Sequence, residues 1–413
     1  MHESALDRVP PTRRILLADA DAFFVAVARL ADPSGAGAAR LLIVGGAPGS
    51  RGVVCSASYE VRAFGVRSGM AIGQALRLCP EATCVPVPRA ACAAKSREIR
   101  AVLERFSPVV SAASIDEFYL DLTGTERLYD GASLAAVSAH IRDAVVRETG
   151  ISVSIGGGTS RLIAKMAAAA AKPAPGAAAA GVHVVEPGAE AEFMTRFELG
   201  DIPGIGPRAQ ERLRQHGLVR VTDALAPDQP ALDRWLGARA AAWLHDRIRG
   251  IDDAPVVARP DARSLSREDT FAADLHDDAE LQRELLRLVV RVAADLRREG
   301  LRARTITVKL RDSDFTTRQA SRTVPGPMEA DGPIYAVARE LLGKLRHARR
   351  TPARLLGVSL SSLRPDDGGQ LALFPGAEAD LETERDRTVA RAVDRVRARF
   401  GDAAILPATL KRR

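Results

Sequence analysis

Leu17-Ala18-Asp19-Ala20-Asp21-Ala22-Phe23-Phe24 places two carboxylates directly after an apolar run that begins at Ile15. A second stretch, Ser114-Ile115-Asp116-Glu117-Phe118-Tyr119-Leu120-Asp121, sets Asp116 and Glu117 beside another apolar run. Apolar runs of this kind predict buried strands. Carboxylates next to a buried sheet are costly unless something cationic neutralises them. The two stretches therefore favour strands whose acidic residues share a cation.

If the two strands are neighbours, Asp19, Asp116 and Glu117 converge as hard oxygen ligands suited to Mg²⁺. A pair of metal ions about 3.5–4 Å apart can activate a hydroxyl and stabilise a leaving phosphate in an in-line displacement. For either stretch alone, a strand that ends in a solvated Asp is the simpler interpretation. Both together, with the phosphate-binding residues described below, favour a metal site.

The bulk composition predicts several domains, and the net charge suits a polyanionic partner without proving one. The chain has 413 residues, which suggests about two to four domains, and its net charge is +7. Four cysteines form no CxxC pair and have no histidine nearby, which argues against a zinc site and fits reduced thiols. The first residues lack the apolar core of a signal peptide, and no apolar stretch approaches the ~20 residues that span a bilayer. We therefore expect a cytoplasmic protein with no membrane partner.

Periodicity divides the chain into three folded units and a tail. Residues 13–185 alternate short apolar runs with helical stretches, as a mixed α/β domain does. A small helical unit follows at 186–254, and a third, α/β unit spans 264–363 with a long helix at Asp277–Glu299. The expected strands are Ile15–Ala18, Leu41–Val44, Val53–Cys55, Ser114–Leu122, Ile151–Ile155, Val182–Val185, Thr305–Arg311 and Leu355–Leu360. The tail ends in a predicted helix with an apolar stripe at Val389, Val393, Val396 and Phe400.

Several motifs, taken in order, carry a resemblance to one family. After the first acidic stretch come a fingers-like segment, Val53–Arg67, and the second acidic stretch. Gly156-Gly157-Gly158-Thr159-Ser160-Arg161-Leu162-Ile163-Ala164-Lys165 and Asp201-Ile202-Pro203-Gly204-Ile205-Gly206-Pro207-Arg208 then follow. Over nearly all of residues 13–374 the chain resembles a Y-family DNA polymerase of the bacterial DNA polymerase IV (DinB) type.

The resemblance implies an α+β, right-hand fold with a palm, small fingers, a helix-hairpin-helix thumb and an α/β little finger. The expected boundaries are palm 13–22 and 89–185, fingers 23–88, thumb 186–254, linker 255–263, little finger 264–364 and C-terminal tail 365–413.

By the same resemblance, Asp19 and Asp116 each hold both of two Mg²⁺ ions, which Mn²⁺ is expected to be able to replace. Glu117 holds the ion at the primer 3′-hydroxyl, and the carbonyl of Ala20 completes the nucleotide-side site. Asp21 and Asp121 lie in the same stretches, and we interpret both as structural or solvated carboxylates.

The expected grip on the incoming triphosphate consists of Ser56, Tyr59, Arg62 and Lys165. Arg is suited to this task because its planar fork donates two hydrogen bonds to phosphate oxygens. The glycine-rich run 156–158 is expected to be a strand-to-helix turn that presents backbone N–H groups to an anion.

Phe23 and Phe24 are expected beside the nucleotide. Phe24 has the position of a steric gate that crowds the sugar C2′ and excludes ribonucleotides, whereas Phe23 also suits a place in the core. Val53 and Cys55 match positions that roof the nascent base pair, and their small size favours tolerance of mismatched or damaged bases.

Two regions are expected to bind the DNA backbone without reading its sequence. The hairpin glycines Gly204 and Gly206, with Arg208, would let backbone amides approach a phosphate. Six basic residues interleave with strand residues of the third unit and would follow the duplex. They are Arg302, Arg304, Lys309, Arg311, Arg318 and Arg322.

Gln370-Leu371-Ala372-Leu373-Phe374 matches the peptide with which bacterial polymerases bind the sliding clamp. Leu and Phe anchors of a peptide can fill apolar pockets on a partner. The match follows the last predicted domain and a Gly368-Gly369 joint.

The implied function is template-directed, low-fidelity DNA synthesis from dNTPs on a primer–template, used for translesion synthesis, by a monomer without a proofreading domain. Ala28, Phe118 and Arg161 depart from the family pattern, but none is an expected metal ligand. One rival is a catalytically silent polymerase-like scaffold, which would be expected to have lost Asp19, Asp116 or Glu117. A second is a nucleotide cyclase on a similar palm, which would need neither the hairpin motif nor the clamp peptide.

Overall fold

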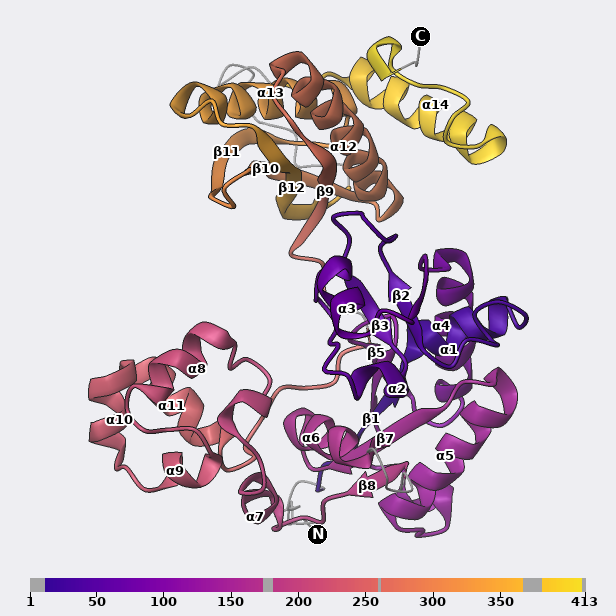
Figure 1. Ribbon diagram of the computed structural model, residues 1–413, viewed down its shortest axis with the longest axis vertical. Coiled ribbons are helices and arrows are strands. Elements are labelled where there is room, and N and C mark those ends of the chain that lie inside the picture. The colour runs from indigo at the N-terminus through magenta and orange to yellow at the C-terminus, as the bar shows by residue number, and fades with distance from the viewer. Residues whose placement is uncertain (1–11, 174–180, 259–260, 367–380, 411–413) are drawn as a thin grey trace, which may run out of the picture. The chain divides into compact units, whose positions relative to one another are not determined.

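The computed structural model describes residues 12–173, 181–258, 261–366 and 381–410. The chain divides into two compact units, 1–260 and 261–413, each of which is described by itself (Figure 1). Within the described ranges, no helix has both the length and the apolar character that crossing a bilayer requires.

The first unit is built on a five-stranded sheet with the order β5-β6-β1-β7-β8. Its central strand, β1 (Ile15–Ala20), runs antiparallel to both neighbours, β6 (Glu117–Asp121) and β7 (Val153–Gly158). The edge strands are β5 (Val109–Ala112) and β8 (Val182–Val184). Every residue of β1 is buried, as the uninterrupted apolar run predicts for a strand that is covered on both faces.

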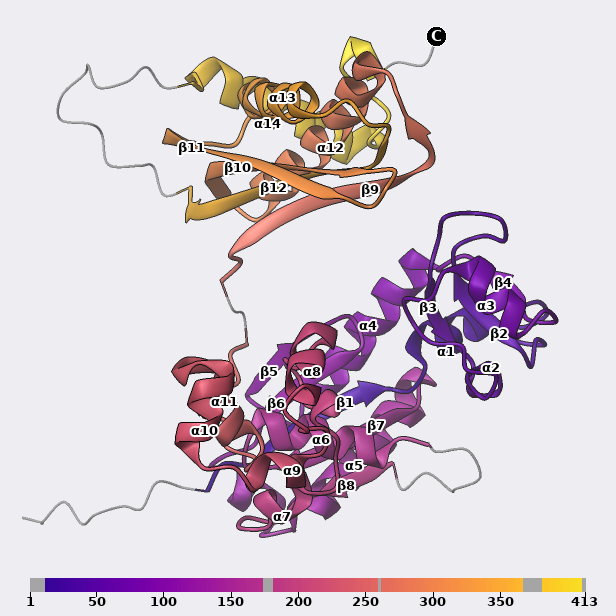
Figure 2. The ribbon, with the colours of Figure 1, turned by 60° about the vertical axis from the view of Figure 1, so that its left-hand side comes forward.

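Helices cover both faces of this sheet (Figure 2). Leu16 and Ala18 pack in one core with α4 (Arg89–Leu103) and α5 (Leu134–Thr149). Because successive strand residues point to opposite faces, Ile15 and Leu17 pack instead against Ala164 and Ala168 of α6. The bounds of α6 are Arg161–Ala171. Asp19 has the same parity as Ile15 and Leu17, so its side chain lies on the α6 face.

A smaller, three-stranded sheet has the order β3-β2-β4. Its strands are β2 (Leu42–Gly45), β3 (Val54–Ala57) and β4 (Thr83–Val85), and its helices are α2 (Tyr59–Arg62) and α3 (Ile72–Leu78). Helix α1 (Phe23–Ala31) links the two sheets, because it contributes Phe23 and Val27 to the core of the large sheet and Val25 and Ala28 to that of the small one.

Five short helices complete the first unit and share one apolar core with Leu162 and Ile163 of α6. They are α7 (Glu190–Met194), α8 (Pro207–Arg214), α9 (Val221–Leu225), α10 (Gln229–Leu236) and α11 (Ala238–Arg247).

The second unit is an antiparallel four-stranded sheet of order β11-β10-β12-β9. Two long helices, α12 (Asp278–Arg298) and α13 (Asp331–Ala348), cover one face and share its core. The strands are β9 (Ser264–Leu275), β10 (Leu301–Asp312), β11 (Thr317–Met328) and β12 (Ala353–Pro365). A last helix, α14 (Glu384–Phe400), packs beside them.

Two sequence-based expectations are wrong in detail. The stretch Ser114–Leu122 is not one strand, because residues 113–116 form a turn between β5 and β6. The run 156–158 is not a strand-to-helix turn but the end of β7, paired with Ile15, Leu16 and Leu17 of β1. A Cβ on Gly156 would lie 2.0 Å from the backbone nitrogen of Ala168, so this glycine lets α6 pack directly on the sheet. The run therefore serves close packing and is not an anion cradle.

Candidate active site

The three predicted metal ligands gather at one end of the large sheet, with Asp19 on β1, Glu117 on β6 and Asp116 in the turn before β6. The β1–β6 register sets Asp19 directly opposite Glu117. The backbone N–H of Ala20 donates to the carbonyl of Asp116 over 2.9 Å, which fixes the preceding turn against β1. Two acidic segments separated by almost a hundred residues thus meet at one end of the sheet, as expected from the sequence.

Two lysines of α6 accompany these carboxylates. Lys165 Nζ donates to both oxygens of Glu117, each over 2.8 Å. Lys172, the residue that caps the C-terminus of α6, brings its Nζ to 2.7 Å from Asp19 Oδ2. Sequence reasoning singled out Lys165 and missed Lys172. The seven-residue spacing from Lys165 could have revealed Lys172, because residues seven apart lie on the same face of a helix.

The electrostatics of Asp19 reflect a crowded, partly desolvated site. Burial raises the pKa of Asp19 above its ordinary value, and the ion pair with Lys172 offsets part of that rise. The negative charges of Glu117 and Asp116 push the pKa further upward. Three carboxylates that repel one another while held in place form an environment that favours an added cation.

The three carboxylates are chemically suited to a divalent metal ion, but their side chains are not arranged as a complete binding site. Among the described residues, no three or more His, Cys, Asp or Glu side chains form a group that could hold an ion. The ammonium groups of Lys165 and Lys172 instead pair with Glu117 and Asp19. Carboxylate oxygens are the ligands that Mg²⁺ and Mn²⁺ prefer. Both lysines therefore contact carboxylate oxygens that a metal ion would use.

Asp21 is a structural carboxylate, which confirms its interpretation from the sequence. The hydroxyls of Ser152 and Ser154 donate to its two oxygens over 2.7 Å and 2.8 Å. These bonds tie the turn after β1 to β7 and leave the buried charge well solvated by hydroxyls. Asp121 accepts from the backbone N–H of Thr123, at the far end of β6 from Glu117.

The three predicted triphosphate residues of the small sheet lie within a few residues of the β3–α2 junction. Ser56 is buried in β3, while Tyr59 and Arg62 are half-buried on α2. The Arg62 guanidinium stacks 4.8 Å from the centre of the Tyr59 ring, and its Nε donates to the carbonyl of Ala57. The Tyr59 hydroxyl is buried and has no hydrogen-bond partner among the residues that the structure describes. Burial, followed by the charge of Asp21, raises the pKa of Tyr59.

Phe23 and Phe24 occupy different environments although they are neighbours. Phe23 is buried in the core of the large sheet, whereas Phe24 is half-buried at the start of α1. Their rings meet edge to face with centroids 5.5 Å apart. The buried Phe23 ring thus packs against the Phe24 ring, and of the two only Phe24 keeps a solvent-accessible surface.

The predicted hairpin lies between a 3₁₀ turn, Leu199–Asp201, and α8. Gly204 has φ of 100°, and a Cβ there would lie 2.9 Å from the Trp243 ring, so both its backbone and its surroundings require glycine. Gly206 caps α8, and Arg208 is exposed in its first turn.

The six basic residues of the second unit do not form one surface. Lys309 pairs with Glu268 over 2.7 Å, and Arg311 donates to the hydroxyl of Thr317. Arg318 is held by the buried Asp312, and Arg322 pairs with Glu340 of α13, on the helix-covered side. Of the remaining two residues, Arg302 pairs with Glu329 and Asp366, and Arg304 donates to the carbonyl of Val324.

The open face of this sheet is rich in hydroxyls. Thr305 contacts Thr323 and Ser362, and Thr307 contacts Ser321, all through side-chain oxygens. The predicted clamp-binding residues 370–374 lie outside the described residues.

Comparisons with known proteins identify the family that the sequence matches. The impB/mucB/samB family model matches residues 18–169, its C-terminal domain model matches 262–373, and the IMS family HHH motif matches 187–218. A DNA polymerase IV of Halorhodospira halophila is 38% identical over 86% of this chain and 96% of its own length. The DNA polymerase IV of Methanoculleus marisnigri is 39% identical over 85% of this chain and 95% of its own.

Solved structures of similar proteins have the same fold as this chain. A Y-family DNA polymerase chimera, Dbh-Dpo4(243-245)-Dbh, is 24% identical with a TM-score of 0.74, covering 84% of this chain and 98% of that one. The crystal structure of DinB from Sulfolobus solfataricus is 25% identical with a TM-score of 0.57 over the same shares. The right-hand fold with a helix-hairpin-helix expected from the sequence is thereby confirmed.

Proposed function

The chain belongs to the Y family of DNA polymerases, of the DNA polymerase IV type, and is a DNA-directed DNA polymerase; from this premise we propose that it performs low-fidelity translesion synthesis by a two-metal mechanism and without proofreading. The observation that carries the proposal is the register of Asp19 against Glu117, with Asp116 adjoining. It supplies the acidic centre that a catalytically silent scaffold would be expected to lack.

In this proposal Asp19 and Asp116 hold two divalent ions, Glu117 holds the ion at the primer 3′-hydroxyl, and the Ala20 carbonyl completes the other site. We take the ions to be Mg²⁺, with Mn²⁺ able to replace it. When bound, such ions lower the pKa of the attacking hydroxyl and stabilise the departing pyrophosphate. The protein's part is positioning and charge compensation, so no side chain need act as a general base.

The two lysines of α6 have a consistent role in such a cycle. While they pair with Glu117 and Asp19 they offset charges that would otherwise be uncompensated. With those carboxylates engaged as metal ligands, both ammonium groups would be available to bind the phosphate oxygens of the incoming dNTP. Lys172 thereby joins Lys165, Ser56, Tyr59 and Arg62 as a proposed triphosphate contact.

The accuracy of synthesis follows from what surrounds the nascent pair. We assign Phe24 as the steric gate against ribonucleotides and Val53 and Cys55 as a small roof. Both roof residues are exposed, which supports weak shape selection against mismatched or damaged bases.

The remaining parts are assigned to DNA and the sliding clamp. We propose palm 13–22 and 89–185, fingers 23–88, thumb 186–254, linker 255–263 and little finger 264–364. Gly204, Gly206 and Arg208 of the thumb would bind backbone phosphates. Among the basic residues of the little finger, Lys309 and Arg311 are favoured because they alternate along β10 with the core residues Val308 and Leu310, and so lie on the face away from the helices. Residues 370–374 would bind the clamp, with the polymerase acting as a monomer.

Primer extension on a template with one abasic site, beside the undamaged template, tests the translesion assignment. We expect full-length product from both templates. A block before the lesion, with efficient extension of the undamaged template, would contradict the assignment. A primer with a mismatched 3′ end, incubated without dNTPs, tests proofreading: it should remain intact, and its shortening would contradict the proposal.

A further inference from the structure

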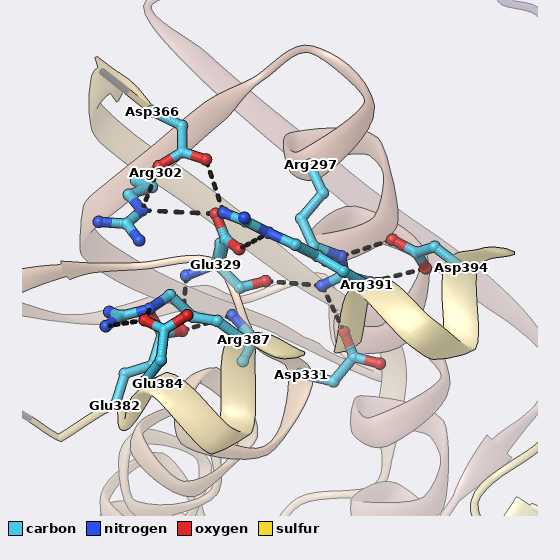
Figure 3. Close-up of polar contacts among 11 residues, drawn as sticks. Arg297, Arg302, Glu329, Asp331, Asp366, Glu382, Glu384, Arg387, Arg391 and Asp394 are labelled. Atoms are coloured by element: carbon cyan, nitrogen blue, oxygen red, sulfur yellow. Dashed lines mark hydrogen bonds and ion pairs between the residues drawn. The ribbon is translucent and has the colours of Figure 1, made fainter. Parts of the chain in front are cut away.

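Helix α14 packs against the rest of the second unit through charged side chains (Figure 3). Arg297 of α12 donates to both oxygens of Asp394, over 2.6 Å and 2.9 Å. Arg391 donates over 2.8 Å to Glu329, a carboxylate only 1% exposed that also pairs with Arg302. Buried charges are costly unless each has a partner, so these contacts fix one specific docking position for α14.

The segment that leads into α14 is tied to the same place. Glu382 is buried and accepts from the backbone N–H groups of Glu329 and Ala330, over 2.8 Å and 2.6 Å. Arg387 pairs with Glu382 one turn into the helix. The N-terminus of α14 is therefore anchored at the β11–α13 connection.

The docked helix turns most of its apolar stripe to solvent, while Val393 is half-buried. Val389, Val396 and Phe400 are 54%, 37% and 67% exposed, and their spacing puts them on one face of α14. An amphipathic helix ordinarily buries such a stripe in its own domain. Here the buried positions are instead Ala390 and Arg397. In the described part of the chain this face stays largely open.

The described residues on either side of the predicted clamp peptide, Asp366 and Glu382, both lie at the docking site of α14. Asp366, the last described residue before the peptide, is held by Arg391 of α14 over 2.6 Å. Gln370 follows only four residues later, within a span of at most roughly 14 Å. From Arg391 to Phe400 the helix is about 14 Å long. A protein seated on residues 370–374 therefore lies within reach of the exposed stripe.

We propose that Val389, Val396 and Phe400 form a second contact surface for the sliding clamp, beside the peptide 370–374. The inference rests on the clamp peptide of the proposed function. Covalent connection brings the clamp to this helix, and the outward apolar face gives it a surface to bury. The polar docking of α14 explains why the helix can offer its apolar side to a partner instead of to its own core.

Titration of the full chain with labelled sliding clamp tests this surface. Val389→Ser with Phe400→Ser should weaken clamp binding about tenfold, because exposed apolar anchors at an interface contribute at this scale. Leu373→Ala with Phe374→Ala should weaken it more. Leu128→Ser is the matched control, since Leu128 is 79% exposed in the other unit, and it should bind like the wild type. Thermal melting checks that each variant is folded, and extension without clamp should be unchanged.

The outcomes separate this inference from the proposed function. Wild-type affinity of the α14 variant, combined with lost binding of the peptide variant, would overturn the second contact only. Wild-type affinity of the peptide variant would overturn the clamp peptide itself. Tighter clamp binding by the α14 variant would mean that the chain's own segment 367–380 covers the stripe. A concentration-dependent dimer that the α14 substitutions abolish would assign the stripe to a second copy. Either of these last results would overturn the inference.

Discussion

Lys172 Nζ lies 2.7 Å from Asp19 Oδ2, so the first carboxylate of the active centre is paired with a lysine from the C-terminus of α6. Seven residues earlier on the same helix, Lys165 pairs with Glu117. Two lysines of one helix thus neutralise two proposed metal ligands on adjacent strands. This arrangement explains how a site that we propose to bind two cations stays folded without them.

Lys172→Ala and Lys165→Ala should each lower the efficiency of dNTP insertion by about ten- to a hundredfold. A charge-assisted hydrogen bond to phosphate contributes roughly 1.5–3 kcal/mol. Single-nucleotide insertion kinetics measure the effect. Lys95→Ala is a matched control, because Lys95 also pairs with a glutamate but lies on α4. Unchanged insertion by Lys172→Ala would remove this lysine from the nucleotide site.

Phe24→Ala should raise the ratio of ribonucleotide to deoxynucleotide insertion, because it removes the half-buried ring proposed to crowd C2′. Phe23→Ala should act differently: truncation of a fully buried ring costs about 3–5 kcal/mol of stability. The two variants are compared by insertion efficiency with each sugar and by thermal melting. An unchanged ratio for Phe24→Ala would assign this ring to the core.

Tyr119 should make stability fall at alkaline pH. Burial raises the pKa of Tyr119 to about 12, from an ordinary value of 10.0, although Arg161 stacks on its ring. Between these values the unfolded chain releases a proton that the folded protein keeps. Stability is therefore full below pH 10 and declines until about pH 12, by roughly 2–3 kcal/mol.

Denaturant titrations of the wild type and Tyr119→Phe, from pH 9 upward, isolate this contribution, because other groups titrate alike in both proteins. We expect the difference between the two unfolding free energies to shift in favour of the Tyr119→Phe variant as the pH rises. Parallel curves would show that the phenol of Tyr119 ionises normally.

Glu329→Ala should cost about 3–5 kcal/mol in the unfolding free energy of the second unit. The substitution leaves the half-buried Arg302 without one carboxylate and removes an anchor of α14. Glu340→Ala is the comparison, since it breaks an exposed pair with Arg322 and should cost less than about 1 kcal/mol. Urea unfolding measures both, and equal losses would argue against a structural role for the Glu329 network.

The acidic centre and the main elements could be predicted from local sequence. The apolar run before Asp19 and the apolar stripe of α12 identify buried elements by their periodicity. Asp19 and Glu117 are expected to converge if their two strands are neighbours, and the β1–β6 register shows that they are.

What local sequence could not reveal depends on how elements pack. The sequence around Gly156 suggests a turn. Glycine is needed there because α6 packs so close to β7 that no Cβ would fit. The cations of β10 and β11 look alike in sequence, yet Arg318 binds the buried Asp312 while Lys309 reaches Glu268. The stripe of α14 predicts a buried face, and only the partners of Arg391 and Asp394 explain why it is exposed.

Single-turnover addition of one dNTP to a primer–template with Mg²⁺ tests the central claim most directly, with Asp116→Asn compared to the wild type. We predict a loss of about a thousandfold or more in rate, with primer–template affinity nearly unchanged, because the substitution removes a metal ligand and leaves the DNA-binding parts intact. Asp121→Asn, which changes a carboxylate at the far end of β6, should react like the wild type. A near-normal rate for Asp116→Asn would contradict the two-metal account.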